Sequence, residues 1–238
     1  VSITGSKTSP YTSMATAAHE IGLAVKISNN GDVILVDAGT YLLSTNIIIN
    51  KGITVSSISG SDVTIIDGNN AVRCVYIAHP NAILEGFTIQ NGKNLSGYGG
   101  GVDIDKNGTV RNCIIRDNQA RDGGGVALDK GGYAENCVIY GNTARYGGGV
   151  RLHSGGEVRN CLIKGNTTTY IGGGVNIWNS GKVKNCVITE NNGPNGAGIR
   201  LRKNGKVYNC IIYYNNGDNY EVNGSGNHFY NTCTTPAL

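Results

Sequence analysis

The feature that most constrains this chain is a repeat of 24 or 25 residues. An Asn-Cys pair recurs five times, and a second asparagine follows each cysteine after five residues. A glycine-rich segment ending in valine or isoleucine opens each copy. The cysteines are Cys113, Cys137, Cys161, Cys186 and Cys210, and the later asparagines are Asn118, Asn142, Asn166, Asn191 and Asn215. A unit this short, without helical periodicity, cannot bury its apolar side alone, so successive units must stack.

Stacking assigns an inward and an outward face to each strand. Parallel strands of adjacent units pair about 4.8 Å apart, and side chains alternate along a strand. Val102, Ile104 and their equivalents therefore face inward, as do the cysteines. At this spacing the cysteine column fits apolar packing with free thiols better than disulfides, which need a shorter separation. A metal-binding cysteine stack is less favoured because the CxxC spacing of zinc sites is lacking. Cys233 is a candidate to extend the column.

The asparagines also have a structural interpretation. An asparagine at a turn after a strand tolerates left-handed backbone and bonds to nearby backbone groups. Stacked above its copies, its amide can form a ladder of side-chain hydrogen bonds. We therefore expect both the cysteines and the later asparagines to be structural ladders.

These patterns predict an all-β fold, a single-stranded right-handed parallel β-helix (solenoid) with coils of about 24 residues and a short N-terminal capping helix. The 37 glycines suit its many tight corners. We expect a cap segment at residues 1–30 and one continuous β-helix at residues 31–238, with the most regular coils at 99–216. Residues 13–21 are the one plausible helix, with Ser13 or Thr12 as N-cap, and should cover the open core of the first coil.

Charge and hydropathy narrow the possible partners. The net charge of +4 comes from scattered lysines and arginines without a basic run, so nucleic-acid binding has little support. No apolar stretch approaches the eighteen residues expected of a membrane-spanning helix. The first ten residues lack the features of a signal peptide. We expect no nucleic-acid partner, no membrane insertion and no signal peptide in this chain.

One surface gathers residues that could bind or react. The outward positions of the strand after each glycine-rich segment stack into two columns across the coils. The first column is Tyr76, Asp103, Ala127, Arg151, Asn176 and Arg200, and the second is Ala78, Asp105, Asp129, His153, Trp178 and Arg202. The predicted ligand-binding residues are Asp103, Asp105, Asp129, Arg151, His153, Asn176, Trp178, Arg200 and Arg202.

These residue types suit an acidic glycan. A tryptophan stacks on sugar faces, and arginines bind carboxylates or sulfates. The three aspartates are candidates for holding Ca²⁺, the one cofactor considered. Histidine titrates near neutral pH, so His153 is a candidate base, with Asp129 and Arg151 as further catalytic candidates. The alternative is a solvated sheet face whose charges discourage aggregation.

Several segments carry a resemblance to a known family. They are residues 31–41, 71–77, 86–92, 209–215 and 233–236, together with the Asn-Cys and GGGV repeats. The chain resembles the right-handed parallel β-helix repeat proteins of the pectate lyase-like superfamily, and its repeats are similar in style to those of polymorphic outer-membrane adhesins. The resemblance implies a secreted or cell-surface bacterial protein. The polygalacturonase-type signatures Asn-Thr-Asp, Asp-Asp and His-Gly do not occur.

Three functions are compatible with these observations. The favoured one is an extracellular or cell-surface module for adhesion, glycan contact or structural assembly, without catalysis, whose partner is an extracellular polysaccharide or a surface receptor. An alternative is a polysaccharide lyase acting on a uronic-acid glycan at the outer face of the GGGV strands. The third is a fibre subunit that self-associates end to end, since an open final coil invites strand pairing.

Overall fold

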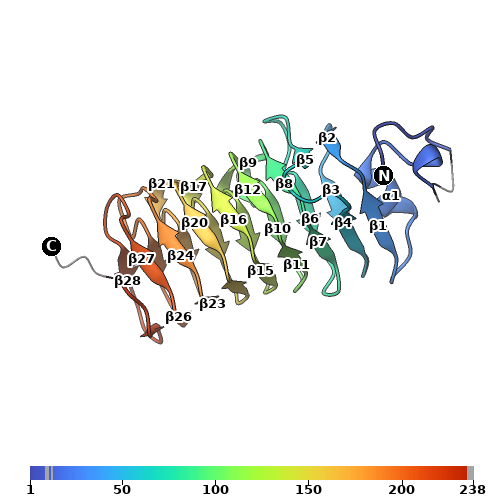
Figure 1. Cartoon of the computed structure of the whole chain (residues 1–238). Coiled ribbons are helices and arrows are strands. Elements are labelled where there is room, and N and C mark those ends of the chain that lie inside the picture. The colour runs from blue at the N-terminus through green and yellow to red at the C-terminus, as the bar shows by residue number, and fades with distance from the viewer. Residues whose placement is uncertain (9–10, 12, 235–238) are drawn as a thin grey trace.

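The chain winds into a right-handed parallel β-helix, which confirms the predicted fold class (Figure 1). The computed structural model describes residues 1–8, 11 and 13–234. Consecutive coils lie side by side along one axis, so the molecule is a rod with the N-terminal segment at one end. Among the described residues, no helix is long and apolar enough to cross a membrane.

Four parallel sheets run along the rod in the described part of the chain. Sheet A contains β1 (Val33–Val36), β4 (Thr54–Ser57), β7 (Ile83–Glu85), β11 (Thr109–Arg111), β15 (Tyr133–Glu135), β19 (Glu157–Arg159), β23 (Gly181–Lys184), β26 (Gly205–Tyr208) and β29 (His228–Tyr230). Sheet B contains β2 (Gly39–Leu42), β5 (Thr64–Asp67), β8 (Thr88–Gln90), β12 (Ile114–Arg116), β16 (Val138–Tyr140), β20 (Leu162–Lys164), β24 (Val187–Thr189) and β27 (Ile211–Tyr213). Sheet C contains β3 (Ile47–Ile49), β6 (Val75–Ile77), β10 (Val102–Ile104), β14 (Val126–Leu128), β18 (Val150–Leu152), β22 (Val175–Ile177), β25 (Ile199–Leu201) and β28 (Tyr220–Val222). Sheet D contains β9 (Lys93–Tyr98), β13 (Gln119–Asp122), β17 (Thr143–Tyr146) and β21 (Thr167–Ile171).

Residues one repeat apart lie directly over each other. Val102 pairs with Val126, and Ile115 pairs with Ile139, as the repeat predicts. The inward apolar side chains of sheets A, B and C form one continuous core that runs the length of the rod. Burying each such side chain stabilises the fold by about 1.5–3 kcal/mol, so neighbouring coils stabilise one another.

The two asparagine columns have different roles. The column from Asn118 to Asn215 forms the predicted ladder, in which each Nδ2 donates to the next Oδ1 at 2.9–3.0 Å. The same oxygens accept backbone N–H groups, for example from Asn118 N to Asn142 Oδ1 at 3.0 Å. The left-handed turns belong instead to the exposed asparagines before the cysteines, which are Asn112, Asn136, Asn160, Asn185 and Asn209.

The cysteine column packs as predicted. Its five members are buried, and all seven cysteines of the chain are free thiols. Cys233 does not extend the column, because it pairs with Ile211 rather than with Cys210. A shift of one residue turns a strand side chain to the opposite face, and Cys233 is accordingly exposed.

The N-terminal helix lies later than predicted. The predicted segment 13–21 contains a short 3₁₀ turn, η1 (Met14–Thr16), and only its last residue belongs to the α-helix, α1 (Ile21–Ile27). The backbone of residues 15–18 instead bonds to that of residues 2–8, which keeps it out of an α-helix. Ile21 and Val25 of α1 are buried against the first coil, so a helix does cover this end of the core. Ser13 therefore caps no α-helix, and Thr12 lies outside the described residues.

Removing one member of the buried ladder is expected to destabilise the protein. Asn166 Oδ1 accepts two bonds from Asn142, and Asn166 Nδ2 donates to Ile139 O and Asn191 Oδ1. Asn166→Ala leaves several of these buried groups unpaired, and the expected loss is about 3 kcal/mol of unfolding free energy. Urea denaturation followed by circular dichroism measures it. In the matched control, Asn160→Gly in the exposed column keeps the left-handed turn and should change stability by less than about 1 kcal/mol.

Candidate functional site

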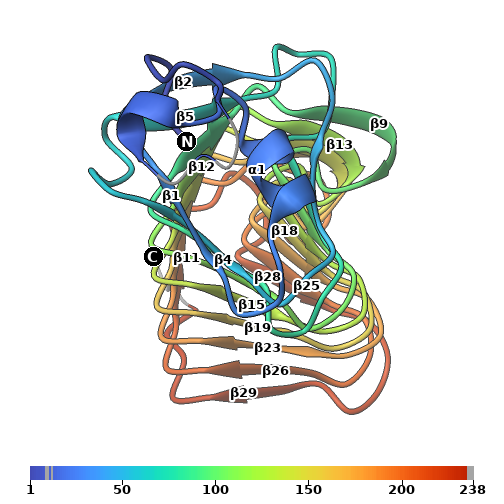
Figure 2. The same ribbon diagram turned by 90° about the vertical axis from the view of Figure 1, so that its right-hand side faces the viewer.

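The predicted surface on sheet C is covered by sheet D. The first glycine of each GGG segment has positive φ, as at Gly123 and Gly147, and turns the chain sharply from sheet D into sheet C. The second glycine has no room for a side chain, because a Cβ on Gly124 would lie 2.4 Å from Gly148 O. Viewed down the rod, β9 and β13 therefore meet β18 and β25 at a corner (Figure 2).

The first predicted column points away from the core but is not solvated. Asp103, Arg151 and Arg200 are 5–7% exposed, and Asn176 is fully buried. The residues of sheet D that immediately precede the glycines, Asp122 among them, pack over this column. The alternative of a solvated sheet face is thus wrong for these residues, because a second layer covers them.

Charge pairing neutralises most of this buried layer. Arg73 Nη2 lies 3.2 Å from Asp103 Oδ2, and Arg151 pairs with Asp122 of sheet D. Arg200 Nε lies 3.3 Å from Glu221 Oε2. Burial lowers the pKa of Arg151, although a guanidinium keeps its charge over the physiological range.

Asn176 is the exception in the buried layer. Both of its amide atoms are buried, and neither has a hydrogen-bond partner. Such unpaired buried groups cost about 1–3 kcal/mol each. The amide lies on the strand between those of Arg151 and Arg200, so an acceptor and a donor are available beside two guanidinium groups.

The second predicted column is partly accessible. Asp105 accepts hydrogen bonds from Lys130 Nζ at 2.8 Å and from Tyr76 Oη at 3.1 Å. His153 Nδ1 lies 3.1 Å from Asp129 Oδ1. The structure therefore brings together the predicted acids and the predicted base, each already engaged with a neighbour.

The Trp178 ring contacts one exposed and one buried guanidinium group. The Arg202 guanidinium lies 3.6 Å from the centre of the Trp178 ring, and Arg151 lies 5.2 Å from the same ring. Trp178 therefore presents one face to Arg202, where sequence analysis expected a sugar. Tyr98 of sheet D lies 5.8 Å from the His153 ring, so the covering sheet also reaches the second column.

Residues of the covering sheet and of the segments beside β6 and β14 also contact the site, and the sequence alone did not place them there. The missed residues that contact the predicted site are Arg73, Tyr98, Asp122, Lys130 and Tyr146. Three of them share a signal, since Tyr98, Asp122 and Tyr146 each stand directly before a GGG segment.

The three predicted aspartates each contact other charged or polar side chains. Asp103 pairs with Arg73, Asp105 and Asp129 share Lys130, and Asp129 also contacts His153. Among the described residues, no three histidine, cysteine, aspartate or glutamate side chains come together as metal ligands. The expectation of Ca²⁺ stays a prediction.

A separate cavity lies at the turn between sheets C and A. Its volume is about 430 Å³, and Tyr133, Glu157, Lys182 and Lys206 are among its lining residues. The glycines in its wall are required by the core, because a Cβ on Gly132 would lie 2.6 Å from Ile104 Cγ2. The cavity is therefore explained by glycines that leave no side chain at this turn. None of the predicted site residues lines it.

Comparison with known proteins identifies the fold. No family model and no curated protein sequence matches the chain. Pectate lyase Pel9A superimposes with a TM-score of 0.61 at 14% identity, over 90% of this chain and 62% of the lyase. Pectin methylesterase from Aspergillus niger superimposes with a TM-score of 0.53 at 14% identity, over 95% of this chain and 84% of the esterase.

The chain has the pectate lyase-like β-helix fold. This confirms the fold that the sequence resemblance implied. At 14% identity the likeness extends to the fold alone. The function must therefore be argued from the residues of this chain.

Asp103 is expected to make stability depend on pH. Burial raises its pKa to about 6, above the value near 3.9 expected in the unfolded chain. The folded state therefore binds the proton more tightly, and the resulting stabilisation, present below about pH 4, is lost as the pH rises through about 6. The loss is about 3 kcal/mol, and Asp103→Asn should remove it.

Urea denaturation at pH 4 to 7 measures this effect. Asp103→Asn should gain stability relative to the unmodified protein as the pH rises. Asp105 provides a control with the opposite pH dependence. The hydrogen bond from Lys130 lowers the pKa of Asp105, so the stabilisation that Asp105 contributes is lost as the pH falls. Parallel pH profiles for the Asp103→Asn variant and the unmodified protein would contradict the assignment.

Proposed function

We propose that this chain is an extracellular or cell-surface module that binds an acidic polysaccharide without cleaving it. The observation that carries the proposal is the Arg202–Trp178 pair, in which an exposed guanidinium is stacked 3.6 Å from an indole ring centre. Among the described residues, Arg202 forms no ion pair with an acidic side chain. Stacking orients its planar donor edge toward solvent-borne carboxylates or sulfates.

The surroundings of Arg202 favour an anionic ligand. Residues 150–238 contain nine lysines and arginines against four acidic residues, whereas residues 1–149 contain eleven against twelve. Arg200 and Asn176 lie behind the exposed pair with polar atoms that lack a hydrogen-bond partner. A carboxylated or sulfated chain laid along the accessible second column of sheet C would meet Arg202, whereas Arg200 and Asn176 stay in the buried layer.

Binding is favoured over catalysis by the pairing of the acids. A lyase that uses Ca²⁺ needs carboxylates free to bind the ion, whereas Asp103, Asp105 and Asp129 have partners of their own. The two similar structures are named as a pectate lyase and a pectin methylesterase. Those names support an acidic glycan as the ligand class to test first.

Truncating Arg202 is expected to weaken glycan binding. Arg202→Ala removes a charge-assisted hydrogen bond donor, so its affinity for polygalacturonate should fall by about tenfold. Trp178→Ala should weaken binding too, because the guanidinium loses its platform. Isothermal titration calorimetry at low and high salt measures both effects, since the ionic contribution is screened by salt.

The controls separate recognition from general charge. Lys26→Ala removes an exposed positive charge from the opposite end of the rod and should leave the affinity unchanged. A neutral glucan should not bind. Failure of the protein to bind carboxylated or sulfated polysaccharides, or equal binding by Arg202→Ala, would refute the proposal.

One observation favours a lyase as the second candidate. His153 is held by Asp129 at 3.1 Å and lies beside Tyr98, so a base is oriented on the surface where a glycan would lie. The base would take the proton next to a uronate carboxylate, and the glycosidic oxygen would leave as a double bond forms.

The lyase candidate predicts an ultraviolet absorbance increase from unsaturated products on incubation with a uronic-acid polymer. His153→Ala should abolish that increase, and a chelator should reveal any dependence on Ca²⁺. No absorbance change on any acidic polymer would eliminate the lyase while leaving the binding function intact.

A further inference from the structure

The outer face of sheet B carries an apolar row that the β-helix leaves uncovered. In five consecutive coils the outward residue beside the buried isoleucine is itself apolar. The row consists of Ile114, Val138, Leu162, Val187 and Ile211. Val187 is 38% exposed and Ile211 is 51% exposed. Parallel sheets that are apolar on both faces are normally covered on both faces, so this row calls for a partner surface.

The chain itself covers this face in the coil just before the row begins. Thr88 occupies the same outward position one coil before Ile114, and it is 5% exposed. Its Oγ1 donates to Ser61 O at 2.8 Å, which places the loop before β5 over this position. From Ile114 onward every member of the row is at least partly exposed.

Within the described residues the row extends to a sixth member, so the centre of this described row can be located. Cys233 pairs with Ile211 and is exposed, so it continues the row by one coil. The midpoint of six members falls between Leu162 and Val187. Opposite charges flank that midpoint, with Lys164 at the end of β20 and Glu190 directly after β24. Neither of these two side chains has an ion-pair partner within the described chain.

We propose that a second copy of this chain covers the row in a two-fold symmetric dimer, with the axis along the strand direction between β20 and β24. This operation reverses the order of the coils and keeps the positions along each strand. Leu162 of one copy then faces Val187 of the other, and Lys164 faces Thr189, so that its long side chain can reach Glu190 one residue further on. Symmetry forms that ion pair twice.

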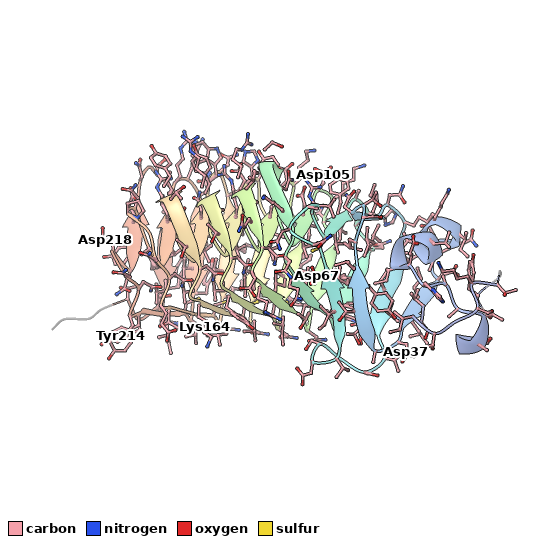
Figure 3. All side chains as sticks on the ribbon, turned by 90° about the horizontal axis from the view of Figure 1, so that it is seen from above. Asp37, Asp67, Asp105, Lys164, Tyr214 and Asp218 are labelled. Carbon is pink, nitrogen blue, oxygen red and sulfur yellow. The ribbon has the colours of Figure 1, made fainter. Side chains whose placement is uncertain are left out.

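The other charged side chains on the outer face of sheet B are compatible with the proposed dimer. Arg116 Nη1 lies 2.7 Å from Asp117 Oδ2, so this pair brings no net charge to the interface. Tyr140 and Tyr213 occupy matching positions on β16 and β27 and face each other across the axis. In Figure 3, Lys164 and Tyr214 lie along one edge of the rod and Asp105 lies at the other, so the dimer leaves the sheet C site open.

A charge exchange tests both the face and its register. Sedimentation velocity over a concentration series, with Cys233→Ser protein to prevent intermolecular disulfides, gives the dimer dissociation constant. Lys164→Glu and Glu190→Lys should each raise it by at least about tenfold, because each creates two like-charge contacts. The double variant should restore the dimer. Lys182→Glu makes the same charge change on sheet A and should have no effect.

Two results would overturn the inference. A Cys233→Ser protein that stays monomeric at every concentration shows that the row serves another partner or none. A dimer that survives Val187→Asp, or that the Lys164 and Glu190 double variant does not restore, places the interface elsewhere. Circular dichroism confirms that these outward substitutions leave the β-helix folded.

Discussion

The buried asparagine ladder fixes the register on which the rest of the molecule depends. The buried amide oxygens of Asn142, Asn166 and Asn191 each accept both a backbone N–H and the side-chain amide of the asparagine in the coil before. A slip of one residue would leave these groups unpaired and turn every inward side chain outward. The outward columns are therefore stacked as strictly as the core, and both proposed surfaces follow from that stacking.

The sequence was informative wherever a residue recurs in every coil. Inward columns such as Cys113 and its copies could be predicted, because five matched positions identify both the period and the face. The position of the N-terminal helix could not be predicted in this way. The backbone pairing that keeps residues 15–18 out of an α-helix involves a segment that does not repeat. The repeat likewise assigned Arg151 to the outer face of sheet C without showing that sheet D lies over it.

Because sheet D covers part of sheet C, several charged side chains on sheet C are buried and not exposed. Exposed arginines and aspartates on a sheet need no explanation, whereas burying them costs desolvation that pairing only partly offsets. Asp122 shows this buried pairing most clearly. Its carboxylate, which is 2% exposed, extends from sheet D to the Arg151 guanidinium on sheet C. Alanine at position 127 shows that an apolar side chain fits the same layer. The charged members are therefore a feature of particular coils and not a requirement of the fold.

The outer faces of sheets B and C differ in how their residues vary from coil to coil. On sheet B the outward row is uniformly apolar over five coils and ends at a thiol, which suits one extended, repetitive partner surface. On sheet C the outward residues change sign along the axis, from Asp103 and Asp105 to Arg200 and Arg202. A repeat that tolerates any residue at these positions has no structural reason to segregate charge in this way. Because Asp103 and Arg200 are buried and paired, the accessible part of this segregation consists of Asp105, Asp129 and Arg202, and the proposed acidic glycan is the ligand class that would use it.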